Sequence, residues 1–455
     1  MKKRRIIWIV TVVIIVLVFI AMLAMGRSET DRRRKEQGYA DGEPDAGLCG
    51  KQDPKVDGGS VSNDEDLKDY SLKIVEMDQQ EKEEALKKLC SYMENCREVY
   101  QRAVNSVAAD LESHGTDTDG NIDAAGMTDF GETNLDENTL HEMIESGAAE
   151  GLSVTCGNRD YNLTNYEKVD AALKKAQEGK AAETEFYQVN SVGIFRYYRL
   201  QFEGNELFVT SASAMLDESM EAEIRQLEKI QAYQWEYTKK GWLIWEKAPS
   251  RNQEMDMHIF CRILPLDEQC REITERYIEP VSYFSNNLFL EDWDTACMEK
   301  IEFNDLFDFL FPMAFGKPLE EESYTDGIPK EEFETVIGRY FDITAERIER
   351  IAGYDGSTGR YPWTAVGFWN RVQQLQPSFP EVVRCEENED GTITAYVEAV
   401  STEEGTDCYY AHAVTLRRKE DGTYVYVGNR VDRERSYCIP AYRARREFER
   451  TDAAQ

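Results

Sequence analysis

The sequence lacks the short motifs that carry most metal, phosphate and nucleophile chemistry. It contains no Cys-x-x-Cys pair, no phosphate loop and no dinucleotide fingerprint, and only four histidines are scattered among its 455 residues. Structural zinc needs about four closely spaced Cys or His ligands, so no metal site and no cofactor are expected. Accordingly, no catalytic, cofactor-binding or metal-binding residue is assigned from the sequence.

Two segments match metal-site motifs only in part. His141-Glu142 begins like a zinc-protease helix, but Glu145 stands where the second histidine ligand belongs. Residues 117–123 alternate oxygen ligands as a calcium loop does, yet the glycine falls at position 4 and the twelfth residue is Thr128. Asx-type turns explain that loop equally well.

Positive charge is scarce outside the N-terminal region. The chain has 53 Lys and Arg against 87 Asp and Glu, a net charge of −34, and a cluster of the basic residues lies within residues 1–40. An acidic body of this kind repels phosphate backbones. Nucleic acid is therefore excluded as a partner.

Long apolar runs are confined to one place. Residues 2–5 are basic, and residues 6–25 follow without a single charge. At about 1.5 Å per residue this run spans roughly 30 Å, the thickness of a bilayer core. We expect a signal-anchor that makes one pass through the cell membrane, with residues 1–5 in the cytoplasm and the acidic C-terminal body outside. A cleaved signal peptide is the alternative.

Cysteine is too sparse for a disulfide scaffold, although an extracytoplasmic body permits disulfides. The chain has ten cysteines. Cys90 and Cys96 fall six positions apart in an expected helix, about 9 Å along its axis and on different sides, so they are not a pair. The connectivity stays open.

The fold class expected is α+β, an N-terminal transmembrane helix followed by two helix-plus-antiparallel-sheet units with a helical segment between them. The boundaries expected are a cytoplasmic stub at 1–5, an anchor at 6–25, a polar linker at 27–68, an α+β domain at 69–250, a mostly helical connector at 251–325, an α+β domain at 326–438 and a charged tail at 439–455.

Periodicity supports both units. An apolar stripe at steps of three and four predicts a long helix from Asp78, packed on its own domain in preference to a coiled coil. Short helices are expected near 136–146 and 165–177, followed by a run of strands from 185. In the second unit, helices near 331–340 and 344–351 precede four strands with Asp-Gly turns, an antiparallel meander. A cone-like fold similar to cystatin or nuclear-transport-factor-like domains is a hypothesis.

One hairpin concentrates aromatic side chains. Trp235 and Tyr237 precede a turn at 239–241, and Trp242 and Trp245 follow it. Such a cluster is typical of a sheet's core face, and it can also stack on a sugar or a peptide.

Several stretches of the second half form a recognisable set: residues 285–290 with 292–293, 303–307, 331–334 with 336–337, 380–383, 390–394 and 411–414. They resemble a family of uncharacterised, membrane-anchored surface proteins from clostridial-type (Firmicutes) bacteria, a domain of unknown function. The resemblance covers roughly 255–430. It implies a surface location and a shared fold, and it carries over no site residue.

The function expected is therefore that of a non-enzymatic, membrane-anchored extracytoplasmic protein that binds a ligand or partner at the cell envelope. Its partners would be the membrane, through residues 6–25, and an envelope protein or glycan. The alternative is a carboxylate-dependent envelope glycan hydrolase, because 87 acidic residues offer many carboxylate pairs. Whether the protein is an enzyme stays uncertain, with the balance against it.

Overall fold

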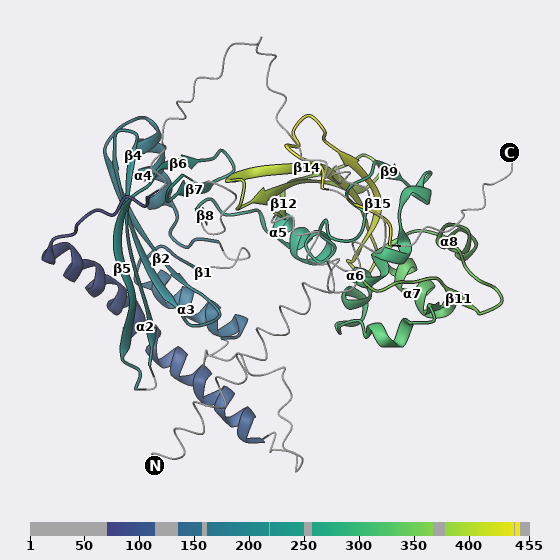
Figure 1. The fold of residues 1–455 in the computed structure, drawn as a ribbon, viewed down its shortest axis with the longest axis horizontal. Coiled ribbons are helices and arrows are strands. Elements are labelled where there is room, and N and C mark those ends of the chain that lie inside the picture. Colours follow the sequence, from purple (N-terminus) through teal and green to yellow (C-terminus); the bar gives the residue numbers. More distant parts are fainter. Residues whose placement is uncertain are drawn as a thin grey trace, which may run out of the picture. The chain divides into compact units, whose positions relative to one another are not determined.

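The computed structural model describes residues 71–113, 135–156, 162–217, 219–249, 257–366, 378–440 and 442–445. Within these ranges it contains seven α-helices and four sheets, two of them five-stranded (Figure 1). The expected mixed α+β class is confirmed.

The first five-stranded sheet keeps the order of its strands in the chain. The strands are β1 (Val154–Cys156), β2 (Ala182–Val189), β3 (Phe195–Glu203), β4 (Glu206–Leu216) and β5 (Ala222–Gln231). β1 runs parallel to β2, and every other neighbouring pair is antiparallel. Successive side chains of a strand point to opposite faces of its sheet. Both faces of this sheet are covered by other elements.

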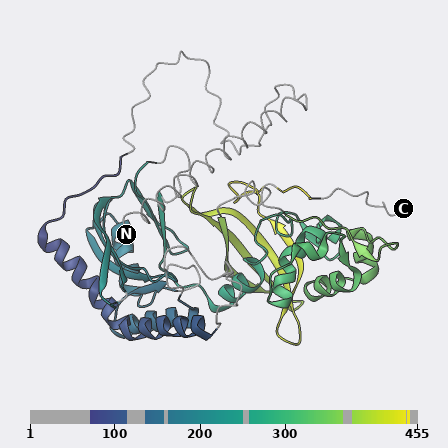
Figure 2. The ribbon, with the colours of Figure 1, turned by 60° about the horizontal axis from the view of Figure 1, so that its bottom comes forward.

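Two helices cover one face of the sheet. They are α2 (Gln79–Ser113) and α3 (Glu137–Ala149), which lie side by side against the strands (Figures 1 and 2). The expected stripe of α2 is buried there, and the Tyr92 ring packs edge-on against Tyr187 at 5.4 Å and Phe195 at 5.6 Å. Packing of the helix on its own domain is confirmed for the described part of the stripe.

The opposite face packs against a helix and a small sheet. These are α4 (Glu167–Gln177) and the three antiparallel strands β6 (Gln234–Tyr237), β7 (Trp242–Glu246) and β8 (His258–Arg262). Leu200, Val209 and Ile230 of the large sheet share a buried cluster with Leu243 and Trp245 of β7. This apolar contact fixes the small sheet over one end of the large one.

The second large sheet is the expected meander with one added strand. β12 (Ser378–Glu387), β13 (Thr392–Ser401), β14 (Thr406–Arg418) and β15 (Tyr424–Val431) pair in order, and the short β9 (Trp293–Asp294) extends the sheet beside β15. Gly391 and Gly422 adopt φ of +77° and +85° in the two Asp-Gly turns, a conformation that glycine reaches without strain.

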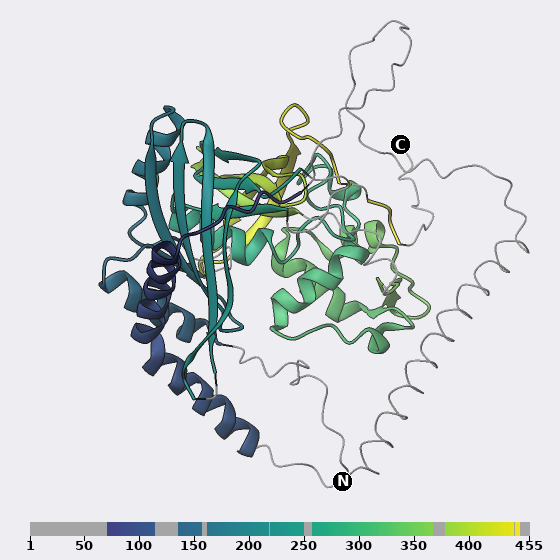
Figure 3. The same cartoon turned by 60° about the vertical axis from the view of Figure 1, so that its left-hand side comes forward.

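Helices from the preceding chain complete this core. They are α5 (Glu268–Ile273), which continues as a π-helical turn (Thr274–Ile278), α6 (Phe303–Phe315), α7 (Lys330–Tyr340) and α8 (Ala345–Ala352). In Figure 3 the green helices α6, α7 and α8 lie side by side. The short strands β10 (Ile328–Pro329) and β11 (Arg360–Tyr361) pair with each other. They join the chain before α7 to the chain after α8.

The connector at 251–325, which was expected to be mostly helical, is helical only in part within its described residues. Its described part begins with strand β8, which pairs with β7, and much of 279–302 is irregular. Side chains replace the missing main-chain partners there: Asn286 donates to the Val281 carbonyl at 3.0 Å, and Asn287 to that of Lys300 at 2.8 Å. Satisfied in this way, the backbone stays buried without a helix.

Some expectations fall outside the described residues. These are the anchor at 6–25, the linker at 27–68, the calcium-like loop at 117–123 and most of the tail. Of the helices that are described, none combines the length and the apolar character needed to cross a bilayer.

Candidate ligand-binding cavity

One row of polar side chains crosses all five strands of the first sheet. Strand register places Thr155, Gln188, Arg196, Ser213 and Gln226 opposite one another in sequence from β1 to β5. All five line a cavity of about 600 Å³. That volume lies within the range typical of small-molecule sites.

The polarity of this face changes along the strands. The next row on the same face combines Phe186 and Tyr198 with Ser211 and Glu228. Beyond it, the row that includes Leu200 is fully apolar over β3 to β5 and lies under the small sheet. The apolar rows hold the two sheets together, and the polar row faces the space left between them.

The facing wall is aromatic and cationic. Trp245 of β7 lines the cavity from the side of the small sheet that packs on the large one. Trp242, Phe260 and Arg262 line it from the other side of β7 and β8, next to Phe379 of β12. The Trp245 ring packs edge-on against Tyr198 across the gap, with 5.8 Å between ring centroids. Hydroxyl and amide groups on one wall and rings on the other offer hydrogen bonds and stacking to a single ligand.

The charge of the cavity is opposite to that of the protein. Its described lining residues include three cations, Arg196, Lys247 and Arg262, and one carboxylate, Glu228, whereas the chain as a whole carries −34. The Arg196 guanidinium has no hydrogen-bond or ion-pair partner among the residues that the structure describes. It is therefore available to an anionic group of a ligand.

Burial also shapes the titration of the site. It raises the pKa of the Tyr198 phenol, and the nearby positive charge of Arg196 opposes that rise. Burial lowers the pKa of Arg262, while the adjacent Glu381 carboxylate works against that change. Tyr198 accordingly stays neutral and can donate its hydroxyl hydrogen to a ligand.

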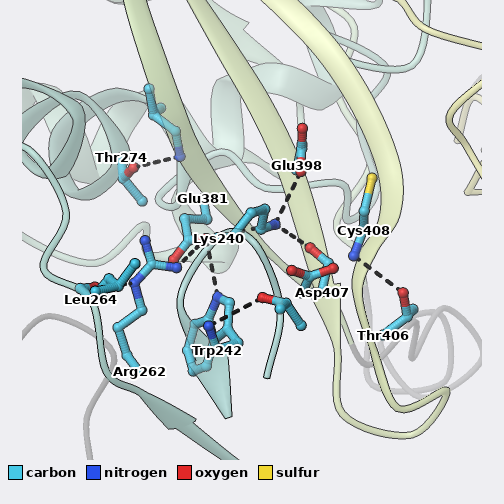
Figure 4. A network of polar contacts seen from close by, with 12 residues as sticks. Lys240, Trp242, Arg262, Leu264, Thr274, Glu381, Glu398, Thr406, Asp407 and Cys408 are labelled. Carbon is cyan, nitrogen blue, oxygen red and sulfur yellow. Dashed lines mark hydrogen bonds and ion pairs between the residues drawn. The ribbon is translucent and has the colours of Figure 1, made fainter. Parts of the chain in front are cut away.

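A buried ionic network holds one wall in place (Figure 4). Glu381 accepts hydrogen bonds from Arg262 at 2.9 Å and from the Trp242 ring nitrogen at 3.2 Å. Lys240, in the turn before β7, reaches Glu398 at 3.2 Å and also bonds the main-chain oxygen of Asp407. Two cavity residues, Trp242 and Arg262, are thereby fixed from behind.

The two glutamates of this network lie directly opposite each other on β12 and β13. Their side chains are only 5% and 7% exposed. Two such carboxylates repel each other unless cations neutralise them, and Lys240 contacts both, at 3.7 Å from Glu381. The pair is committed to these contacts, and neither glutamate lines the cavity.

The hydrolase alternative needs two carboxylates flanking one bond, roughly 5–10 Å apart. Among the described residues that line the cavity, Glu228 supplies one carboxylate and no second is present. The described lining thus offers hydrogen bonding and charge, and no acid–base pair.

His141, which begins the partial zinc-protease motif, lies on the surface of the protein. Its ring nitrogen lies 3.1 Å from the Glu145 carboxylate, and both side chains are well exposed. No group of three or more potential metal ligands gathers among the described residues.

The aromatic hairpin belongs to the core, and two of its tryptophans also line the cavity. Tyr237 is buried and donates its hydroxyl hydrogen to Asp170 of α4 at 2.7 Å, a core contact. Trp242 and Trp245 are 4% and 1% exposed, yet both line the cavity. The polar row cannot be recognised in the sequence, because its five residues come from five different strands. The alternation Arg196, Tyr198, Leu200 was its one local signal.

The fold and cavity define an α+β protein with a ligand-sized pocket between a five-stranded sheet and a three-stranded one. The chain belongs to a family of unknown function, DUF6070, whose model matches residues 82–445. The expected membership of a domain family of unknown function is confirmed in that form. No curated protein and no solved structure matches the chain.

Proposed function

We propose that this protein is a non-enzymatic binding module of the cell envelope and that the cavity is its ligand site. The observation that carries the proposal is the polar row from Thr155 to Gln226, which shares a cavity with two tryptophans and contains an arginine without a partner among the described residues. A binding site needs a cavity of suitable size and groups that match the ligand, and it needs no acid–base pair. The described lining offers such groups.

The ligand class follows from the chemistry of the two walls. Gln188, Gln226, Thr155 and Ser213 carry groups that both donate and accept hydrogen bonds, which suits the hydroxyls of a sugar. Trp242 and Trp245 add apolar surface against a sugar ring. Arg196 adds a cation for a carboxylate. These features favour an acidic saccharide of one to two rings over a peptide.

The proposed location rests on the sequence. The uncharged run 6–25 after the basic residues 2–5 favours a single-pass anchor with the acidic body outside. The body that would face the envelope carries all of the net negative charge, because residues 1–40 are net positive. Membership of the clostridial-type surface family remains part of the proposal. Protease added to intact cells should then remove the body, whereas complete protection would reject this topology.

The ligand proposal is tested on the full chain in detergent by calorimetry with three probes. Digalacturonate should bind, galactobiose should bind at least tenfold more weakly because it lacks the carboxylates, and a Glu-Glu dipeptide should not bind. Binding of the dipeptide alone would replace the saccharide by a peptide. Binding of none would reject the cavity as an acidic-saccharide site.

A further inference from the structure

Two cysteines distant in sequence meet beneath the second sheet. Cys270 lies in the first turn of α5 and Cys385 near the end of β12, 115 positions further along. Their Sγ atoms are 3.6 Å apart, in van der Waals contact. Cys270 is buried, at 4% exposure, and Cys385 is half-buried.

Both ends of this contact are anchored by other bonds. Asp267 caps α5, and its carboxylate accepts from the Cys270 amide at 3.3 Å. One turn later, Thr274 accepts a hydrogen bond from the Val382 amide of β12 at 2.9 Å. The Thr274 hydroxyl in turn donates to the Cys270 carbonyl at 2.8 Å. The helix and the strand are thus tied next to the thiols, so the sulfurs stay close.

The other described thiols have different surroundings. Cys96 directs its sulfur at the main-chain oxygen of Met143, Cys408 at that of Arg435 and Cys438 at that of Ile439. Cys297 lies against the Asp294 carboxylate at 3.3 Å. Of the thiols that the structure describes, Cys270 and Cys385 are the pair brought into sulfur–sulfur contact.

We propose that Cys270 and Cys385 are a disulfide site, closed by thiol–disulfide exchange with a small-molecule or protein disulfide. A disulfide bond is about 2.05 Å long, so the sulfurs, now 3.6 Å apart, must approach by about 1.5 Å. The bond would join α5 to β12 and cross-link a loop of more than one hundred residues.

The exchange balances in two steps. One thiol of the pair loses its proton, and its thiolate attacks the oxidant disulfide, forms a mixed disulfide and releases one thiol. The other thiol of the pair then loses its proton and attacks the protein sulfur of the mixed disulfide, which releases the second thiol. In sum, two protein thiols lose two protons and two electrons, and the oxidant disulfide is reduced to two thiols.

The proposal stands apart from the ligand and location proposals, because it concerns the geometry of the thiols alone. The full chain in detergent is equilibrated with oxidised glutathione, alkylated and digested, and the peptides are analysed by mass spectrometry. The expected product is a cross-linked peptide that contains residues 270 and 385. Isolation from its native cells without reductant then shows whether the compartment also oxidises the pair.

Variants make the test specific. In oxidised protein, reductant should lower the midpoint of thermal unfolding by several degrees, because the cross-link restricts the unfolded chain. Cys385→Ser should abolish that shift, whereas Cys408→Ser, a half-buried cysteine of the same sheet, should retain it. Full alkylation of both thiols in folded protein after exposure to oxidised glutathione would overturn the proposal.

Discussion

The Nδ1 atom of His412 lies 2.8 Å from Oδ1 of Asn429 inside the second sheet. Asn429 donates its amide hydrogens to the carbonyls of Phe289 and Glu291, so its oxygen is an acceptor and the histidine nitrogen carries the hydrogen. The other ring nitrogen, 3.1 Å from the Tyr283 hydroxyl, then accepts. The ring is fully satisfied in its neutral form, and burial lowers the pKa of His412 to about 4.

Because His412 is neutral in the folded protein, we expect the free energy of unfolding to fall in mild acid. Its pKa is about 6.5 in the unfolded chain and lower in the folded one, so the unfolded state binds more protons between those values. The contribution is complete above about pH 6.5 and is lost as the pH falls toward 4, at about 1.4 kcal/mol per unit. Urea unfolding of wild type and His412→Gln at pH 7.5 and 5.5 measures it.

The comparison between the two proteins separates His412 from other titrating groups. The wild-type advantage over His412→Gln should shrink by about 1.4 kcal/mol between pH 7.5 and 5.5, since roughly one unit lies below the unfolded pKa. An advantage that stays constant would show that the pKa of His412 is the same in the folded and unfolded protein.

Much of the fold can be predicted from local patterns in the sequence. The stripe from Leu86 onward predicted α2, and the Asp-Gly turns predicted the meander from β12 to β15, because both signals are local. Strand β8 and the irregular segment around Asn286 were missed. Both are stabilised by partners distant in the sequence, β7 for the strand and the region of Lys300 for the irregular segment. The local pattern of apolar residues does not predict such contacts.

The candidate site was the least predictable part for the same reason. Arg196 and Gln226 lie thirty positions apart and meet in one row only through the registers of β3, β4 and β5. The tryptophans of the hairpin were visible in the sequence, and their role in the wall of a cavity was not. A polar position on a strand looks like a solvent-facing one until its opposite wall is known.

Removing Lys240 should destabilise the protein strongly. Lys240→Met leaves the opposed carboxylates of Glu381 and Glu398 with less compensation in a buried place. Breaking a buried ion pair from one side typically costs about 3–5 kcal/mol; Arg262 and Arg435 remain as partners, so we expect about 3 kcal/mol. Urea unfolding at pH 7.5 measures the change.

The adjacent lysine is the matched control. Lys239→Met removes the same charge from the same turn at an exposed position, and its effect should stay within about 0.5 kcal/mol. Equal effects of the two variants would contradict a special role for the buried network.

The turn that carries Lys240 also depends on Gly241. This glycine has a φ of +90°, and a Cβ there would lie 2.3 Å from the Cβ of Leu264. Gly241→Ala should therefore combine backbone strain of about 1 kcal/mol with a clash of several more. Thermal unfolding compares it with Gly179→Ala, where φ is +73° and no atom lies within 4 Å.

The control isolates the clash from the backbone strain. Gly179→Ala should cost about 1 kcal/mol, the strain alone. If both variants unfold at the same temperature, the close approach of Leu264 does not constrain the turn.

Calorimetry with digalacturonate measures whether the cavity binds an anionic ligand through Arg196. Arg196→Gln removes one of the three cations that line the cavity, and Arg225→Gln removes an exposed cation next to Gln226 on β5. A lost charge-assisted hydrogen bond of about 1.5–3 kcal/mol weakens binding at least tenfold. We expect that loss for Arg196→Gln, with the affinity of Arg225→Gln unchanged; equal affinities of the two variants, or no binding by the wild type, would contradict the account.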